Sequence, residues 1–184
     1  MSHLVRKMCV GVALSMGLVG VANATYVNGN PLKYNDPTGL ILNVAPSLQP
    51  TVSAMQNSSS IFNNLTGVLN DSSNTYNLKP GTLPDGVPAV TICSLGGGCN
   101  TILDLAQLAK VNYATKMGTQ ACMSTDRAIG HELSHALYHE ELFAPFNWIS
   151  PHSFIIGNEN AIMNQVNPAS PDRDPYNDTL YKRQ

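Results

Sequence analysis

The first strong pattern in the chain is a series of apolar residues at helical spacing between residues 48 and 69. Asn and Ser dominate the opposite face, which predicts an amphipathic helix over this range. Three serines at residues 58–60 predict a break within it, and the Asn-rich residues 70–74 end it. The apolar positions are Leu48, Val52, Met55, Ile61, Phe62, Leu65 and Leu69.

Shorter apolar runs between Gly- and Pro-containing turns follow and predict β-strands. Residues 75–78 and 87–93 are two such runs, and residues 101–105 form a third. Residues 106–113 do not distinguish a helix from a strand. The mixture of elements predicts an α+β fold with a small sheet.

A second long helix is predicted over residues 126–143, which read DRAIGHELSHALYHEELF. Ile129, Leu133, Ala136 and Leu137 share one face of it and are expected in the core. Ser124-Thr125 supplies a good N-cap, and Asp126 is favourable in the first turn because the helix dipole is positive there.

Composition and charge exclude some classes of partner. At 184 residues, with 43% hydrophobic and 12% charged residues, the chain suits one globular domain. A formal charge of −2 offers no basic surface, so no nucleic-acid partner is expected. After the N-terminal segment, no run reaches the ~18 apolar residues that a membrane span requires. The protein is expected to be a monomer.

The first 24 residues have the order of a secretory signal peptide. Arg6 and Lys7 precede an apolar stretch over residues 8–21, and Ala22-Asn23-Ala24 then forms an A-x-A cleavage signal. We expect cleavage after Ala24 and a secreted or periplasmic product; the alternative is a buried N-terminal helix. Removing Arg6 and Lys7 from the 10 basic residues leaves 8 against 12 acidic ones, a net charge of −4.

Three cysteines remain beyond this segment. Cys93 and Cys99 flank a flexible Ser-Leu-Gly-Gly-Gly loop that can close a small disulfide in an oxidising compartment. Three reduced thiols are the equal alternative. In the disulfide case, Cys122 is the odd thiol.

The candidate chemistry lies on the second long helix, in the sequence His131-Glu132-Leu133-Ser134-His135. His131 and His135 are four residues apart, so their imidazoles stack on one face and can bind one Zn²⁺. Glu132 can act as general base toward a water activated by that ion, and later protonate the leaving amine. The pattern is the H-E-x-x-H of zinc peptidases. The alternative is a surface helix with scattered histidines.

A third ligand is needed, because catalytic zinc takes three protein ligands plus a water. Glu159 is the preferred candidate, since Asn158 can cap a short helix over residues 158–166 that places Glu159 in its first turn. His152, in a Pro-rich loop, is the alternative. The alternative to the ligand role is that Glu159 is an ordinary first-turn acid stabilised by the helix dipole.

Residues 129–176 resemble the NleD-like effector metallopeptidases, which also occur as C-terminal domains of RHS toxins. The shared residues are the H-E-x-x-H-A of residues 131–136, the pair Glu159-Asn160, and an R-x-x-Y pattern at Arg173 and Tyr176. The resemblance implies a zincin fold with Glu159 as a zinc ligand. It also implies that Arg173 and Tyr176 donate to the tetrahedral oxyanion, a role that guanidinium and phenol groups suit. The alternative is that Arg173 only pairs with neighbouring acids.

A second resemblance lies in residues 25–43, TYVNGNPLKYNDPTGLILN. The positions of Tyr26, Asn30-Pro31 and the DPTGL of residues 36–40 resemble the stretch that ends the repeat core of RHS polymorphic toxins. In those proteins a variable toxin domain follows. The resemblance implies a linker over residues 25–43 and a toxin-like metallopeptidase domain over residues 44–184.

These observations predict a zinc-dependent endopeptidase of the secreted toxin or effector type. Its substrate is expected to be a protein or peptide, and an immunity protein is a candidate partner. Two alternatives stay open: a non-catalytic secreted metal-binding protein, and an inactive remnant of an RHS toxin.

Overall fold

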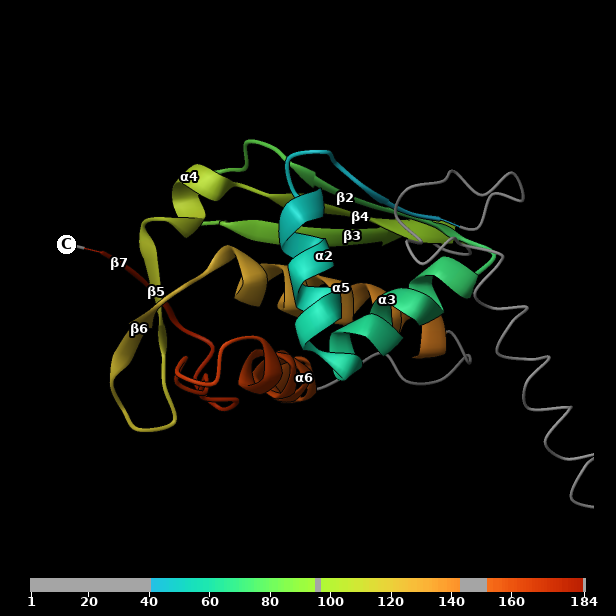
Figure 1. The fold of residues 1–184 in the computed structure, drawn as a ribbon. Coiled ribbons are helices and arrows are strands. Elements are labelled where there is room, and N and C mark those ends of the chain that lie inside the picture. The colour runs from blue at the N-terminus through green and yellow to red at the C-terminus, as the bar shows by residue number, and fades with distance from the viewer. Residues whose placement is uncertain (1–40, 95–96, 143–151, 184) are drawn as a thin grey trace, which may run out of the picture. The chain divides into compact units, whose positions relative to one another are not determined.

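The computed structural model describes residues 41–94, 97–142 and 152–183, whose fold is drawn in Figure 1. Helices and strands are mixed along these residues, which confirms the α+β class. In chain order the elements are β1 Ile41–Val44, α2 Gln49–Ser58, α3 Ser60–Asp71, β2 Thr75–Pro80, β3 Ala89–Ser94, β4 Gly97–Leu103, α4 Leu105–Leu108, β5 Val111–Ala114, β6 Gln120–Cys122, α5 Thr125–Leu142, α6 His152–Val166 and β7 Leu180–Lys182.

The predicted signal peptide of residues 1–24 lies outside the described residues, as does most of the predicted linker. Residues 41–43, the last of that linker, form part of β1. Across residues 41–94, 97–142 and 152–183, none of the helices combines the length and the apolar character that a bilayer crossing requires.

The larger sheet has four strands in the order β1-β2-β4-β3. Strands β1, β2 and β4 run parallel, whereas β3 is antiparallel to β4 and forms an edge. Buried residues alternate along the strands, for example Tyr76 and Leu78 on β2. Helices cover one face of this sheet (Figure 1), so the alternation sends apolar side chains toward them.

A row of asparagines crosses the other face of the sheet. Asn43, Asn77 and Asn100 stand at paired positions on β1, β2 and β4. Asn43 Nδ2 donates to Asn77 Oδ1 at 3.2 Å, and Asn77 Nδ2 donates to Asn100 Oδ1 at 3.0 Å. These cross-strand side-chain bonds reinforce the register of the three parallel strands.

Cys93 and Cys99 form a disulfide between β3 and β4, directly opposite each other in the register. Cys122 is free and exposed. Gly98, which precedes Cys99, is also required by the packing of the sheet. A Cβ atom at Gly98 would lie 1.6 Å from the carbonyl oxygen of Thr75, so β4 can approach β2 this closely only with glycine there.

The helix predicted over residues 48–69 is divided into α2 and α3, with the break at the predicted serines. Ser59 lies between the two helices, and its Oγ accepts a hydrogen bond from the backbone N–H of Phe62 at 3.1 Å. Ser59 is therefore the N-cap of α3. The apolar faces of both helices are buried, as expected for Val52, Met55 and Leu69 among others.

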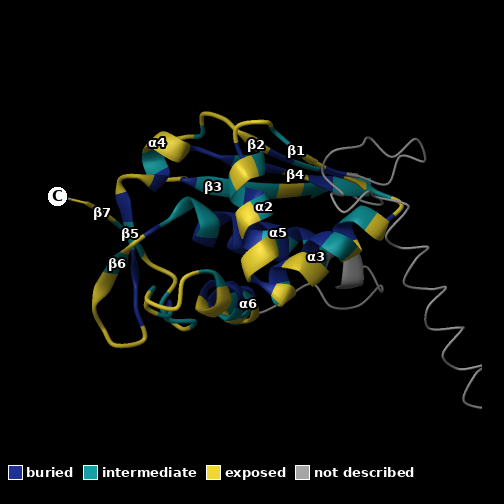
Figure 2. Cartoon of the chain, in the orientation of Figure 1, coloured by how far each residue is buried: buried dark blue, intermediate teal, exposed yellow. Residues whose placement is uncertain are grey.

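Helix α5 is buried without interruption over residues 127–134. Figure 2 colours the helices and strands by burial. Helix α5 packs against β3 and β4 on one side and against α6 on another, with α2 and α3 beside it (Figure 1). Ser124 caps it as predicted, since its Oγ accepts a hydrogen bond from Arg127 N at 3.2 Å. Of the predicted core residues, Ile129, Leu133 and Ala136 are buried and Leu137 is half-buried.

Helix α6 differs from its prediction, because it begins at His152 instead of Asn158. Its buried face contains Ile155, Ile156, Glu159, Asn160, Ile162 and Met163, which is a regular helical spacing. Gly157-Asn158 resembled a helix boundary, yet Gly157 faces open space and interrupts nothing. Because Glu159 and Asn160 on this buried face are polar, the spacing of apolar residues did not predict the full length of the helix.

A smaller antiparallel sheet, in the order β6-β5-β7, joins the end of the chain to its middle. Residues 106–113, which the sequence left undecided, are divided between α4 and β5. Thr115 and Arg173 form an isolated antiparallel bridge next to this sheet. The segment between α6 and β7 is thereby fixed beside β5.

Replacing both Cys93 and Cys99 with Ser should lower the free energy of unfolding by about 2 kcal/mol, because the bridge closes a loop between residues only 6 apart in sequence. Denaturant unfolding of the oxidised protein measures this loss. Cys122→Ser is the matched control and should change the midpoint little, because that thiol is exposed and unbonded. Coincident unfolding curves for the double variant and the wild type would contradict the prediction.

Candidate metal centre

Three histidine side chains converge on one side of α5. His131 and His135 lie one turn apart on α5, and His152 is the first residue of α6. The Nε2 atom of His131 is 3.2 Å from Nε2 of His135 and 2.9 Å from Nε2 of His152. Within the described parts of the chain, these three residues form a group whose ligand atoms all lie within 4.8 Å of one another. Such a group could hold a metal ion.

The chemistry of the rings fits a cation at this point. A neutral imidazole carries a proton on one nitrogen and a lone pair on the other. Nδ1 of His131 lies 2.7 Å from Oε2 of Glu159, and Nδ1 of His152 lies 2.7 Å from Oδ2 of Asp178. These carboxylates favour the proton on Nδ1, so both Nε2 lone pairs face the same position. Converging lone pairs repel each other, and a bound cation removes that repulsion.

The surroundings favour the neutral form of His135 and His152, which is the form that binds metals. Burial lowers the pKa of His135 to about 3, and the neighbouring His131 and His152 act in the same direction. Burial also lowers the pKa of His152, with His131 contributing, whereas the carboxylate of Asp178 opposes the shift.

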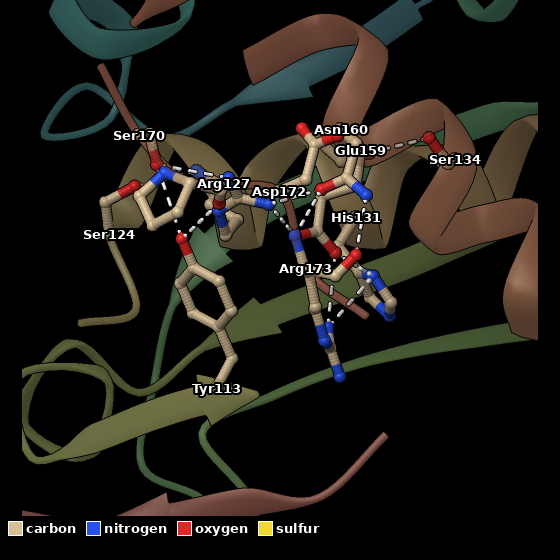
Figure 3. Close-up of polar contacts among 12 residues, drawn as sticks. Tyr113, Ser124, Arg127, His131, Ser134, Glu159, Asn160, Ser170, Asp172 and Arg173 are labelled. Carbon is tan, nitrogen blue, oxygen red and sulfur yellow. Dashed lines mark hydrogen bonds and ion pairs between the residues drawn. The ribbon is translucent and has the colours of Figure 1, made fainter. Parts of the chain in front are cut away.

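Glu159, predicted as the third ligand, lies on the opposite side of the His131 ring. Its Oε1 accepts a hydrogen bond from Arg127 Nη1 at 2.5 Å, and its Oε2 accepts one from Arg173 Nη1 at 3.2 Å besides contacting His131 Nδ1. Figure 3 shows these contacts. Both oxygens are thus engaged away from the Nε2 atoms. In this structure the ring that lies beside the Nε2 atoms of His131 and His135 is that of His152, the alternative candidate.

The earlier start of α6 explains why His152, and not Glu159, lies beside the Nε2 atoms of the other two histidines. Because the helix begins at His152, that residue is near the helix of His131 and His135, and Glu159 lies about two turns further on. Burial by itself raises the pKa of Glu159, but the hydrogen bond with His131 and the charges of His131, Arg173 and Arg127 together lower it. Glu159 is therefore a buried carboxylate that orients His131.

Glu132 is buried beside His131 and points toward the edge strand β3. Its Oε2 accepts a hydrogen bond from Thr91 Oγ1 at 2.8 Å. Burial raises the pKa of Glu132, whereas the charge of His131 and the hydrogen bond from Thr91 lower it by less. A carboxyl group with a raised pKa is better matched to proton transfer near neutral pH.

Glu132 and the three histidines line a common cleft of about 380 Å³. One wall is formed by residues 86–91, which include the start of β3, and another by Arg173, Asp178 and Leu180. Leu108 and Met123 add apolar surface. A second hollow, of about 550 Å³ over the smaller sheet, is lined by neither histidine nor carboxylate. The cleft with the histidines is therefore the candidate site.

The two predicted oxyanion donors have different positions. Arg173 is buried in the cleft wall, where its Nη1 donates to Glu159 and its Nη2 to Asp178. Those two N–H groups are thus already engaged with carboxylates. Tyr176 is 93% exposed and is not among the residues that line the cleft.

Arg127 is a fully buried residue of the site that the sequence did not single out. Its Nη1 donates to Asn160 Oδ1 at 2.9 Å as well as to Glu159, and its guanidinium lies 4.5 Å from the centre of the Tyr113 ring. Nη2 donates to the carbonyl of Pro171 at 3.0 Å. One signal was available, because Arg127 is four residues before His131 on the same helix face.

Asn160 holds the backbone of Arg173 in place. Its Oδ1 accepts from Arg173 N at 2.8 Å, and its Nδ2 donates to Arg173 O at 2.8 Å. The pair Glu159-Asn160 therefore connects α6 both to α5 and to the segment that follows α6 (Figure 3).

Glu159→Gln should lower the free energy of unfolding by about 3–5 kcal/mol, because it leaves two buried guanidinium groups facing a neutral amide. The pKa of Glu159 is lowered in the folded state. Its contribution is therefore fully present above the pKa of an unfolded glutamate, about 4.3, and is lost as the pH falls through the lower folded value.

Urea unfolding of wild type and Glu159→Gln across this acid range measures the effect. The difference between them should be full at neutral pH and should shrink below about pH 4. Asp172→Asn, which removes an exposed ion pair with Lys116, is the matched control and should cost under about 1 kcal/mol. A difference that stays constant in acid would show that the charge of Glu159 is not the stabilising feature.

Comparisons with known proteins give no relative for this chain. No protein-family model, no curated protein and no solved structure matches it. The functional assignment is therefore based on the geometry of the three histidines and the residues around them.

Proposed function

We propose that this chain is a zinc-dependent peptidase of the zincin type. The observation that carries the proposal is the convergence of three Nε2 atoms in a cleft that is also lined by the buried carboxyl group of Glu132. Imidazole nitrogens suit Zn²⁺. Three protein ligands are also the number found in catalytic zinc sites, which keep the fourth position open.

The geometry of Glu132 supports its role as general base. When bound, zinc supplies a Lewis acid and lowers the pKa of a coordinated water to about 7. Thr91 engages Oε2 of Glu132, which leaves Oε1 to accept the proton of the attacking water. Glu132 then donates that proton to the leaving amine. Hydrolysis is balanced, because the water contributes OH to the new carboxyl group and H to the amine.

The edge strand supports a peptide as substrate. β3 is the last strand of the larger sheet, and its residues 89–91 line the cleft. The free side of an edge strand presents backbone N–H and C=O groups, which an extended peptide can pair with. A peptide paired with β3 in this way would lie beside Glu132 and the histidines.

The biological setting of the proposal is taken from the sequence. The resemblance of residues 129–176 to NleD-like effector peptidases, together with the RHS-like residues 25–43, extends it to a secreted toxin or effector that cuts a protein. An immunity protein would be the expected partner. Arg173, with its N–H groups on Glu159 and Asp178, is proposed to hold those carboxylates in place.

The ligand assignment predicts that His131→Ala, His135→Ala and His152→Ala each lose bound zinc, since each removes one of three donors. Elemental analysis of purified, dialysed protein measures this loss. Glu159→Gln should keep the three donors and weaken zinc binding by roughly 10–100-fold, as expected when a group that orients a ligand is lost. Full zinc retention in His152→Ala, with complete loss in Glu159→Gln, would return the third position to Glu159.

The catalytic assignment predicts that Glu132→Gln retains zinc but loses peptide cleavage by about 10²–10⁴-fold, because the general base is removed while the ligands stay. Cleavage of a broad peptide library, read by mass spectrometry, measures the loss. Asp172→Asn is the control and should cleave as the wild type does, because its ion pair with Lys116 lies outside the cleft. A wild-type protein that binds zinc and cuts no peptide would favour the non-catalytic metal-binding alternative.

A further inference from the structure

Two of the three histidines are held by carboxylates, and one arginine joins those carboxylates. Nδ1 of His131 lies 2.7 Å from Glu159, and Nδ1 of His152 lies 2.7 Å from Oδ2 of Asp178. Between them, Arg173 donates through Nη1 to Glu159 at 3.2 Å and through Nη2 to Asp178 Oδ1. The contacts form a continuous series from one ring to the other: His131, Glu159, Arg173, Asp178, His152.

The two ends of this series differ in how strongly the fold fixes them. His131 lies within α5, and its partner Glu159 is fully buried. His152 is at the first position of α6, and its side chain is 36% exposed. A first-turn residue has fewer neighbours to restrict its rotamer, so the direction of the His152 ring depends more on the partner of its Nδ1 atom.

Asp178 is suited to be that partner. Its side chain is 56% exposed, but one oxygen is bound to the buried guanidinium of Arg173, which leaves the other for His152. The backbone of Arg173 is in turn fixed by two hydrogen bonds with the side-chain amide of Asn160. Just beyond Asp178, β7 pairs with β5, which anchors the segment from its other end.

We propose that Asp178 is the positioning residue of His152: its carboxylate lies against Nδ1, favours the proton on that nitrogen and thereby turns the Nε2 lone pair toward His131. The inference rests on the metal site proposed above. It predicts that Asp178 acts on the ligand geometry, because its ion pair with His152 is partly exposed on both sides and such pairs contribute little to the stability of the fold.

The first test needs no metal. In metal-free protein at neutral pH, long-range ¹⁵N–¹H correlation of the imidazoles should show His152 in the wild type with its proton on Nδ1. In Asp178→Ala the proton should move toward Nε2, while His131 keeps its proton on Nδ1 because Glu159 is unchanged. Asp178→Glu should restore the wild-type tautomer. An unchanged tautomer of His152 in Asp178→Ala would overturn the proposal.

The second test uses Zn²⁺ alone, in competition with a chelator. Asp178→Ala should bind zinc roughly 10–100-fold more weakly, with partial recovery in Asp178→Glu. Asp172→Ala is the matched control, since it removes an acid from the same segment that pairs with Lys116 and contacts no histidine. An equal loss in Asp172→Ala would show a general effect of charge, and an unchanged affinity in Asp178→Ala would overturn the proposal.

Co²⁺ substitution separates positioning from a merely structural role. The visible absorption of bound Co²⁺ reports the number and arrangement of ligands, so it should change in Asp178→Ala and remain as in the wild type in Asp172→Ala. The unfolding midpoint should fall less in Asp178→Ala than in Glu159→Gln, because the side chain of Asp178 is 56% exposed whereas Glu159 is fully buried. Failure of the wild type to bind any zinc would reject the metal site itself, and the tautomer of His152 in metal-free protein would still decide the role of Asp178.

Discussion

The arrangement of the site depends on a carboxylate buried among two guanidinium groups and an imidazole. Removing Glu159 from water is costly, and the cost is offset only when every oxygen is paired. Arg127 and Arg173 provide two positive charges, and Glu159 and the half-exposed Asp178 provide two negative ones. The guanidinium groups of this network are thus paired with carboxylates, and the Nε2 atoms of the histidines take no part in those ion pairs.

The same network decides which parts of the fold meet at the cleft. Arg127 belongs to α5, Glu159 and Asn160 to α6, and Arg173 to the segment before β7. Hydrogen bonds among them fix three stretches of chain that the larger sheet does not connect. The sheet supports α5 from the other side and supplies Thr91, which orients Glu132. The ligands and the candidate base are therefore positioned by different layers of the molecule.

Local patterns in the sequence predicted most of the elements but not the detailed site. The break between α2 and α3, the Ser124 cap and the core face of α5 follow from neighbouring residues, and these predictions are confirmed. The exchange of Glu159 and His152 was not predictable in the same way, because Gly157-Asn158 resembles a boundary inside a continuous helix. Asp178 and His152 meet only in the tertiary structure, so the spacing of residues in the sequence did not predict their contact.

The order of the site residues along the chain has a consequence for synthesis. A ribosome releases β1 to β4 and the helix with both histidines of the H-E-x-x-H motif before it releases Arg173, Asp178 and the strand that anchors them. A nascent chain that has reached the end of α6 therefore holds all three imidazoles, yet it lacks the guanidinium and carboxylate that orient His152. During translation, the cluster can be completed only after residues 173–178 have emerged.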